Sequence, residues 1–202
     1  MNSPRVKPLA QLLEEVRQCR ICAAHLPHGC RPTLRAHENA RLLIIGQAPG
    51  RTVHETGIPW NDPSGDRLRK WLNISKPVFY DETGIAIIPT GFCFPGTGKG
   101  GDLPPRPECA PQWHPPLLAA LPKIELTLLI GNYAQAFYLK DQRRKTLADT
   151  VAAWQEFLPK FLPLPHPSPR NMRWFKNHPW FDAEVVPELQ RRVARILAIT
   201  TN

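Results

Sequence analysis

The stretch Leu42-Leu43-Ile44-Ile45-Gly46-Gln47-Ala48-Pro49-Gly50 decides the fold of this chain. Four apolar residues lead directly into a turn that contains glycine and proline. A short run that is apolar on both faces and bounded by turn residues is typical of a central strand in a parallel sheet. Ligands of open α/β sheets bind beyond the carboxyl ends of the strands, so we expect a ligand close to residues 47–50.

Further apolar runs alternate with helical patterns along the 202 residues. Strands are expected at 41–45, 85–88, 126–131 and 161–165, and helices at 8–20, 64–72, 113–121, 133–139, 146–158 and 184–198. Pro115 and Pro116 are placed in the first turn of their helix, where proline is tolerated. The segments 46–65 and 89–109 are expected to be long loops. This order predicts an α/β fold, a single three-layer αβα domain with a central, mainly parallel four-stranded sheet over residues 1–202.

The chain is basic, with 26 lysines and arginines against 17 acidic residues and a net charge of +9. Such a balance suits a polyanionic partner, although a merely basic soluble protein has the same composition. No apolar run approaches the roughly 18 residues that span a membrane, and the first residues do not resemble a signal peptide. We therefore expect a cytoplasmic monomer that binds nucleic acid and no membrane.

Two motifs carry a resemblance to a known family. The first combines Gly46–Gly50 with Thr56-Gly57-Ile58-Pro59-Trp60 and Gly65, and the second is His166-Pro167-Ser168-Pro169. Together they resemble the uracil-DNA glycosylase superfamily, and their spacing is closest to its family 4 branch, which has Gly-Glu-Ala-Pro-Gly and Thr-Gly-x-Pro-Phe. The resemblance runs from Cys19 to about Asn171. It implies a DNA repair hydrolase that flips a deaminated base, uracil before others, out of DNA and cleaves its N-glycosidic bond.

The resemblance assigns roles to residues that we expect to face one another across one pocket. Trp60 stands where family 4 has its stacking Phe, although a core aromatic is the alternative, and base stacking contributes roughly 1–3 kcal/mol. His166 and the backbone around Gln47 are the catalytic candidates, as donors to the charge that develops on the base. The family's uracil-reading Asn falls on Pro89, which leaves Thr90 as the nearest polar side chain. The implied base-binding residues are Gln47, Ala48, Trp60, Thr90 and His166.

The first motif departs from the family at the position that activates water. The fastest superfamily members have an Asp where Ala48 stands, and family 4 has a Glu where Gln47 stands; neither residue found here can act as a general base. The other candidates in this loop are His54, Glu55, Asn61 and Asp62. A catalytically weak protein that binds a damaged base with the same fold is therefore the alternative function.

The cysteines support the same family. Cys19 and Cys22 are separated by two residues, and Cys93 and Cys109 by 15, which matches the set that holds a four-iron–four-sulfur cluster in family 4. Four thiolates select an iron–sulfur cluster or zinc, and four unconnected thiols remain the third possibility. Cys30 is expected to be a free thiol nearby. If a cluster were the active part, the chain would instead be a redox or metal-dependent protein.

Residues after the second motif are expected to contact DNA at the mouth of the pocket. They are Ser168, Arg170, Asn171 and Met172, and either Arg170 or Met172 would enter the gap that the flipped base leaves. Lys99, in a glycine-rich loop, could also reach a phosphate.

Overall fold

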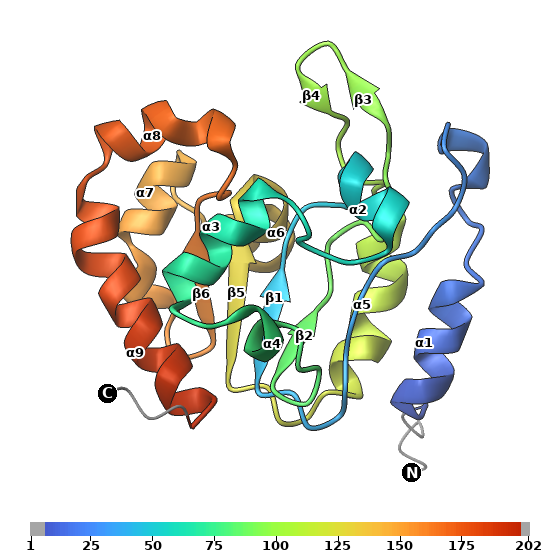
Figure 1. The fold of residues 1–202 in the computed structure, drawn as a ribbon, viewed down its shortest axis with the longest axis horizontal. Coiled ribbons are helices and arrows are strands. Elements are labelled where there is room, and N and C mark those ends of the chain that lie inside the picture. Colours follow the sequence, from blue (N-terminus) through green and yellow to red (C-terminus); the bar gives the residue numbers. More distant parts are fainter. Residues whose placement is uncertain (1–6, 199–202) are drawn as a thin grey trace.

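A parallel sheet of four strands forms the centre of the computed structural model, which describes residues 7–198 (Figure 1). The strands are β1 (Leu42–Ile45), β2 (Ile85–Ile87), β5 (Leu126–Ile130) and β6 (Phe161–Leu164), in the order β2-β1-β5-β6. All three neighbouring pairs are parallel. The first apolar run is therefore an interior strand, paired on both sides as predicted.

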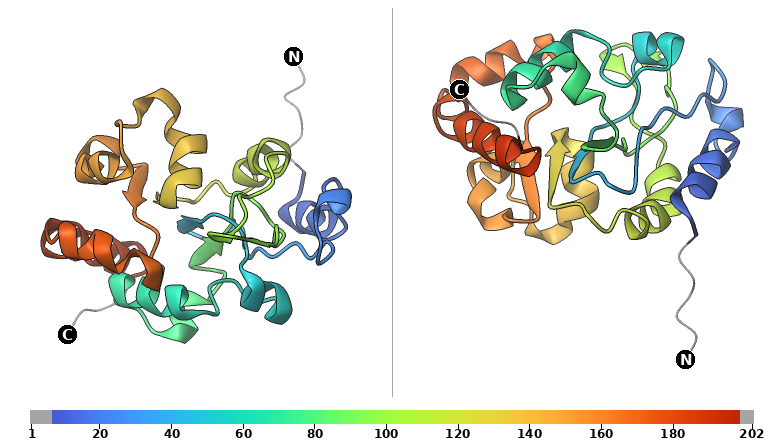
Figure 2. Two further views of the ribbon diagram at one scale, coloured as in Figure 1. Left: turned by 90° about the horizontal axis from the view of Figure 1, so that it is seen from above. Right: turned by 60° about the horizontal axis from the view of Figure 1, so that its bottom comes forward.

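Alternating side chains of the strands fill two separate hydrophobic cores, because successive residues of a strand point to opposite faces. Leu42 and Ile44 pack in one core with α3 (Pro63–Leu72) and α9 (Val186–Ile196). Leu43 and Ile45 pack in the other core with α1 (Leu9–Arg17), α5 (Cys109–Ala119) and α6 (Gly131–Leu139). Helices thus cover both faces of the sheet (Figure 2), and the predicted α/β fold with three layers is confirmed.

Shorter elements complete the fold. The helices are α2 (Arg51–Thr56), α4 (Lys76–Phe79), α7 (Leu147–Ala152) and α8 (Met172–Asn177). Strands β3 (Thr97–Gly98) and β4 (Gly101–Asp102) pair as an antiparallel hairpin. Turns of 3-10 helix occur at Ala23–His25, Lys140–Gln142, Trp154–Phe157 and Pro169–Asn171, and a π-helical turn at Phe181–Val185 precedes α9. Among residues 7–198, no helix has the length and apolar character that crossing a membrane requires.

Several boundaries differ from the sequence prediction. Helix α5 begins at Cys109, so Pro115 and Pro116 lie inside it and not in its first turn. The buried side chains Trp113 and Leu117 anchor this helix in the core despite the prolines. The predicted helix 146–158 is interrupted after Ala152 and continues as a 3-10 turn. The predicted loops 46–65 and 89–109 contain α2 and the β3–β4 hairpin, respectively.

The carboxyl ends of the parallel strands meet at one edge of the sheet. The Gly46–Gly50 turn follows β1, and His166 lies two residues beyond β6. In Figure 1 this edge is uppermost, with the β3–β4 hairpin and α8 rising on either side of it. Both motifs and the residues that follow them therefore gather at the edge where ligands of such sheets bind.

Candidate functional site

Trp60 and His166 bring the two motif loops together. The centres of their rings lie 5.7 Å apart, and the ring planes are inclined at 32°. Trp60 comes from the segment between α2 and α3, whereas His166 follows β6. Both side chains are partly buried. The loops meet as expected, with an aromatic surface next to an imidazole.

Two glycines allow Trp60 to occupy this position. A Cβ on Gly46 would lie 2.8 Å from Trp60 Cζ2, and a Cβ on Gly65 would overlap the Trp60 carbonyl oxygen. Trp60 itself has a φ of 56°, in the left-handed region that bulky residues avoid. Such a conformation costs on the order of 1–3 kcal/mol and persists only where the surroundings impose it. The indole therefore lies directly on the backbone of the first motif in a position that its neighbours determine.

Two side chains that the sequence did not indicate, Arg69 and Tyr80, donate hydrogen bonds to the backbone of the segment that carries Trp60. Arg69 is only 8% exposed, and its Nη1 donates to the Trp60 carbonyl oxygen at 3.2 Å. Its Nη2 donates to Asp66 at 2.6 Å. The Tyr80 hydroxyl donates to the Pro59 carbonyl oxygen at 2.9 Å. The only signal in the sequence is that Arg69 falls next to Leu68 on the apolar face of α3, where a charged residue needs a partner.

His166 lies in a setting that favours its neutral form. Burial lowers its pKa, and the negative charges of Asp62 and Asp102 oppose this shift. A Cβ on Gly131, the first residue after β5, would lie 3.5 Å from His166 Cβ, so the imidazole packs closely on the sheet edge. A neutral imidazole carries one N–H donor and one acceptor nitrogen. His166 can therefore donate a hydrogen bond to a group placed beside Trp60.

Thr90 fixes the backbone of the first motif. Its hydroxyl donates to the Gln47 carbonyl oxygen at 2.6 Å, and its N–H donates to the Gly46 carbonyl oxygen at 3.0 Å. Thr90 is buried, whereas Gln47 and Ala48 are partly exposed in the turn. The structure thus brings the implied base-binding residues to one edge of the sheet and gives Thr90 a structural task there. A contact between these residues and a base stays a prediction.

The residues after His166 divide into two groups. Asn171 Nδ2 donates to the His166 carbonyl oxygen at 2.8 Å, and Ser168 Oγ accepts from the Arg170 N–H at 3.2 Å, so both side chains stabilise the loop itself. Arg170 and Met172 are exposed, Met172 to 55%. Of the four residues, Arg170 and Met172 are therefore the most accessible to solvent and to a binding partner.

Arg67 joins this loop to α3. Its Nη1 donates to the Ser168 carbonyl oxygen at 3.3 Å, its Nη2 lies 3.0 Å from the Met172 sulfur, and its guanidinium stacks over the Phe175 ring. Sequence reasoning did not single out Arg67, because these contacts join segments far apart in the chain. They place Met172 at the surface beside the second motif.

The β3–β4 hairpin adds a third segment to the site. Asp102 Oδ2 lies 3.2 Å from the position that a Cβ on Gly50 would occupy. A Cβ on Gly101 would overlap Nη1 of Arg170. The hairpin therefore touches the turn of the first motif through Asp102 and the loop of the second motif through the preceding residue, Gly101. Sequence reasoning assigned no role to Asp102.

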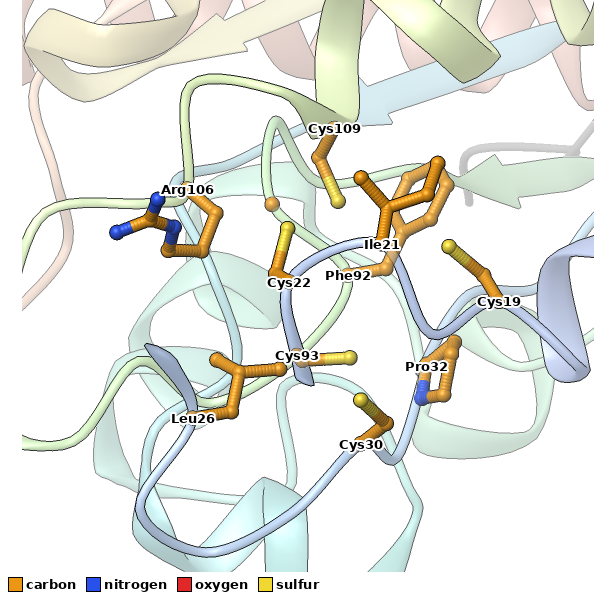
Figure 3. Close-up of a pocket in the computed structure, with 11 residues that line it drawn as sticks. Cys19, Ile21, Cys22, Leu26, Cys30, Pro32, Phe92, Cys93, Arg106 and Cys109 are labelled. Atoms are coloured by element: carbon orange, nitrogen blue, oxygen red, sulfur yellow. The ribbon is translucent and has the colours of Figure 1, made fainter. Parts of the chain in front are cut away.

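All five cysteines line one pocket on the side of the sheet that carries α1 and α5 (Figure 3). Cys19 and Cys22 follow α1, Cys93 lies in the loop after β2, and Cys109 opens α5. Figure 3 shows the sulfurs of these four residues and of Cys30 turned toward a shared space walled by Ile21, Leu26, Pro32 and Phe92. None of the five forms a disulfide.

Cys22 and Cys109 of this pocket are buried, and an ion pair lies close to Cys22. Burial raises the pKa of Cys93 to about 12 and that of Cys109 to about 11. Arg106 pairs with Glu108 at 2.5 Å, and Cys22 Sγ lies 3.6 Å from Glu108 Oε2. Within the part of the chain that the structure describes, no three His, Cys, Asp or Glu side chains are grouped so that they could hold a metal ion.

The chain matches the model of a known protein family. The model of the uracil DNA glycosylase superfamily matches residues 34–190. This range includes both motif loops, the β3–β4 hairpin, Cys93 and Cys109, whereas Cys19, Cys22 and Cys30 lie before it.

Proposed function

The chain belongs to the uracil DNA glycosylase superfamily, and from this premise we propose that it removes a deaminated base, uracil before others, from DNA. Membership supports a function of the DNA glycosylase type, and with it DNA binding and DNA repair. The observation that carries the finer proposal is the pairing of Trp60 with His166. A fixed aromatic surface beside an imidazole donor is what recognition and release of a flipped base require.

The proposed reaction begins when the damaged nucleotide leaves the base stack. The base rests against the Trp60 indole, which is held in place by Gly46, Gly65 and Arg69. As the N-glycosidic bond breaks, negative charge develops on the base. His166 and the backbone N–H groups around Gln47 stabilise this charge as hydrogen-bond donors that need no reorganisation.

The DNA partner fits the charge and exposure of the surrounding surface. The net charge of +9 favours a polyanion. Exposed Arg170 would contact a phosphate, and exposed Met172, anchored by Arg67, would enter the gap left by the flipped base. Ser168 and Asn171 would act on DNA mainly through the loop shape that they maintain.

We include a four-iron–four-sulfur cluster in the proposal, with Cys19, Cys22, Cys93 and Cys109 as its ligands. Support comes from the donor set, since soft thiols from three separate segments line one largely apolar pocket. Zinc is the alternative, because the same four thiols could also serve as the tetrahedral ligand set of a structural zinc site. A bound cluster would serve a structural role, joining α1 to the loop after β2 and to α5.

A strand-nicking assay tests the proposed function. Oligonucleotides carrying uracil, hypoxanthine or xanthine, single- and double-stranded, are incubated with the protein and then cleaved at abasic sites with alkali. We expect excision of at least one base, strongly reduced in His166→Ala and reduced in Gln47→Ala. The control is His37→Ala, in the loop that precedes β1, and it should match the unmodified protein. Binding of damaged DNA without any excision would instead establish the alternative, a damaged-base binding protein, which the Gln47-Ala48 sequence motivates.

A further inference from the structure

The β3–β4 hairpin supplies a carboxylate at the place where the first motif lacks one. We propose that Asp102 orients the attacking water and accepts its proton in the reaction proposed above. This inference rests on the proposed function, because it assigns the one role in that reaction that Gln47 and Ala48 cannot fill.

Hydrolysis of the N-glycosidic bond has a simple balance. The oxygen of water bonds to C1′ of the sugar, and the electron pair of the C1′–N bond leaves with the base. The water proton passes to a general base. A carboxylate can accept that proton, whereas an amide or a methyl side chain cannot. The reaction therefore gains from a carboxylate close to the turn that follows β1.

Asp102 lies close to that turn in a hairpin that touches both motifs. Its Oδ2 lies over Gly50, at 3.2 Å from the position of a Cβ there, while its Oδ1 lies 3.4 Å from Thr97 Oγ1 within the hairpin. The neighbouring residue Gly101 packs against the Arg170 guanidinium of the second motif loop. The side chain is exposed and so remains accessible to water before DNA arrives.

The electrostatics of the site agree with this placement. The negative charge of Asp102 opposes the lowering of the His166 pKa that burial causes, which agrees with a hairpin carboxylate in the neighbourhood of the second motif. The charged groups nearby are the Arg170 guanidinium, which packs against the adjacent Gly101, and the Asp62 carboxylate, which also acts on the pKa of His166. In this assignment the Asp102 carboxylate acts as the general base toward water, and the neutral His166 imidazole donates a hydrogen bond to the departing nucleobase.

The other carboxylate near His166 already has a structural task. Asp62 is the N-cap of α3, and its Oδ1 accepts from the Gly65 N–H at 2.8 Å. Of the remaining loop candidates, His54 packs with its ring 5.8 Å from that of Phe94, and Glu55 is exposed near the end of α2. Asp102 is the carboxylate that lies against the motif turn itself.

Single-turnover excision tests the assignment with three isosteric variants, Asp102→Asn, Asp62→Asn and Asp141→Asn. Asp141 lies in the 3-10 turn after α6 and controls for the loss of one negative charge. We expect Asp102→Asn to slow excision by roughly 10²–10⁴-fold while its affinity for damaged DNA is kept or increased. Asp102→Glu, which keeps a carboxylate, should restore part of the rate.

The outcomes separate this assignment from the proposed function. Excision by Asp102→Asn at the unmodified rate, or loss of excision in Asp62→Asn alone, would overturn the role of Asp102 and leave the proposed function intact. A fall in DNA affinity equal to the fall in rate would also overturn it, because the hairpin would then act only in binding. No excision by the unmodified protein from any of the three substrates would overturn both.

Discussion

Arg69 donates a hydrogen bond of 3.2 Å from inside the hydrophobic core to the carbonyl oxygen of Trp60. Its guanidinium also lies over the rings of Phe79 and Tyr80, 5.2 and 5.8 Å from their centres. A buried cation thus anchors a residue whose left-handed backbone is unfavourable by itself. The aromatic surface of the site is therefore set before any ligand binds, which lowers the entropic cost of binding.

Removal of this anchor should weaken both the fold and the site. Arg69→Met keeps the aliphatic packing but loses the hydrogen bond, and we expect the free energy of unfolding in urea to fall by about 1–3 kcal/mol. Affinity for uracil-containing DNA should fall as well, because Trp60 is released from its constrained position. The control is Arg191→Met on α9, whose side chain is 59% exposed and pairs with Glu188 at the surface, with an expected change below about 1 kcal/mol. A less stable Arg69→Met protein with unchanged DNA affinity would show that Arg69 does not position Trp60.

Trp60→Ala should remove the stacking surface. Base–aromatic stacking contributes roughly 1–3 kcal/mol, so the affinity for single-stranded uracil DNA should fall by roughly 5- to 150-fold. Fluorescence anisotropy measures this affinity directly. Trp60→Phe retains an aromatic face and should lose far less. If Trp60→Ala bound DNA as tightly as the unmodified protein, Trp60 would be a packing residue, as the alternative interpretation of the sequence holds.

Substitution of Gly65 tests how closely α3 approaches the Trp60 backbone, and substitution of Gly100 is its control. Gly65→Ala places a Cβ on the Trp60 carbonyl oxygen, where only backbone can give way, whereas a Cβ on Gly100 meets no atom within 4 Å. We expect Gly65→Ala to destabilise the protein by more than about 4 kcal/mol, enough to lower its soluble yield. The free energy of unfolding of Gly100→Ala should lie within about 0.5 kcal/mol of that of the unmodified protein. Equal thermal midpoints for the two variants would contradict the close approach of α3 to Trp60.

The sheet could be predicted because its signals are local. Leu42–Ile45 and the three other apolar runs are each complete within a few residues, and their order specifies a parallel arrangement. Element α2 escaped prediction because six residues are too few to show a helical period. The β3–β4 hairpin has only two residues in each strand, so no alternation marks it. Helix α5 begins four residues before the predicted start at residue 113, because two successive prolines such as Pro115 and Pro116 normally mark a first helical turn.

The residues of the candidate site likewise include some that the sequence indicates and some that only the fold brings into place. Trp60 and His166 could be paired from the sequence because each stands in a motif with a characteristic order. Arg69 and Asp102 could not, since their importance comes from contacts with Trp60 and Gly50 that exist only once the chain has folded. The absence of a carboxylate from the first motif can be read from the sequence, whereas the hairpin that places Asp102 beside Gly50 cannot.

The cysteine pocket makes a separate prediction about metal content. Purified protein should contain iron and sulfide and show a broad visible absorbance band, and Cys93→Ser should lose all three. Cys30→Ser is the matched variant, since Cys30 lines the same pocket but lies outside the proposed ligand set. It should retain the iron and the band. Bound zinc without visible absorbance would identify zinc as the metal, and loss of iron in Cys30→Ser would add Cys30 to the ligands.

His114 should make the stability of the protein depend on acid. This imidazole is 1% exposed, stacks on Phe92, and meets the Tyr138 hydroxyl through Nδ1 and the Pro89 carbonyl oxygen through Nε2, at 3.0 Å. Because a carbonyl oxygen only accepts, Nε2 carries the proton and Nδ1 accepts from Tyr138. Burial lowers the pKa of His114 to about 4, against about 6.5 in an unfolded chain. Between these values the unfolded chain binds more protons, so the free energy of unfolding should fall by about 3 kcal/mol in total as the pH drops from about 6.5 to about 4.

Urea unfolding at several pH values isolates this contribution. His114→Gln, which cannot titrate, should be less stable than the unmodified protein at pH 7 and should lose less stability over the acid range. His37→Gln, in the loop before β1, should keep the full dependence on pH. Parallel curves for the unmodified protein and His114→Gln would mean that other groups cause the acid sensitivity. A difference in stability that is confined to the interval between the two pKa values would instead attribute the acid sensitivity to His114. This imidazole contacts the Pro89 carbonyl oxygen, next to Thr90, whose hydroxyl donates to the first motif.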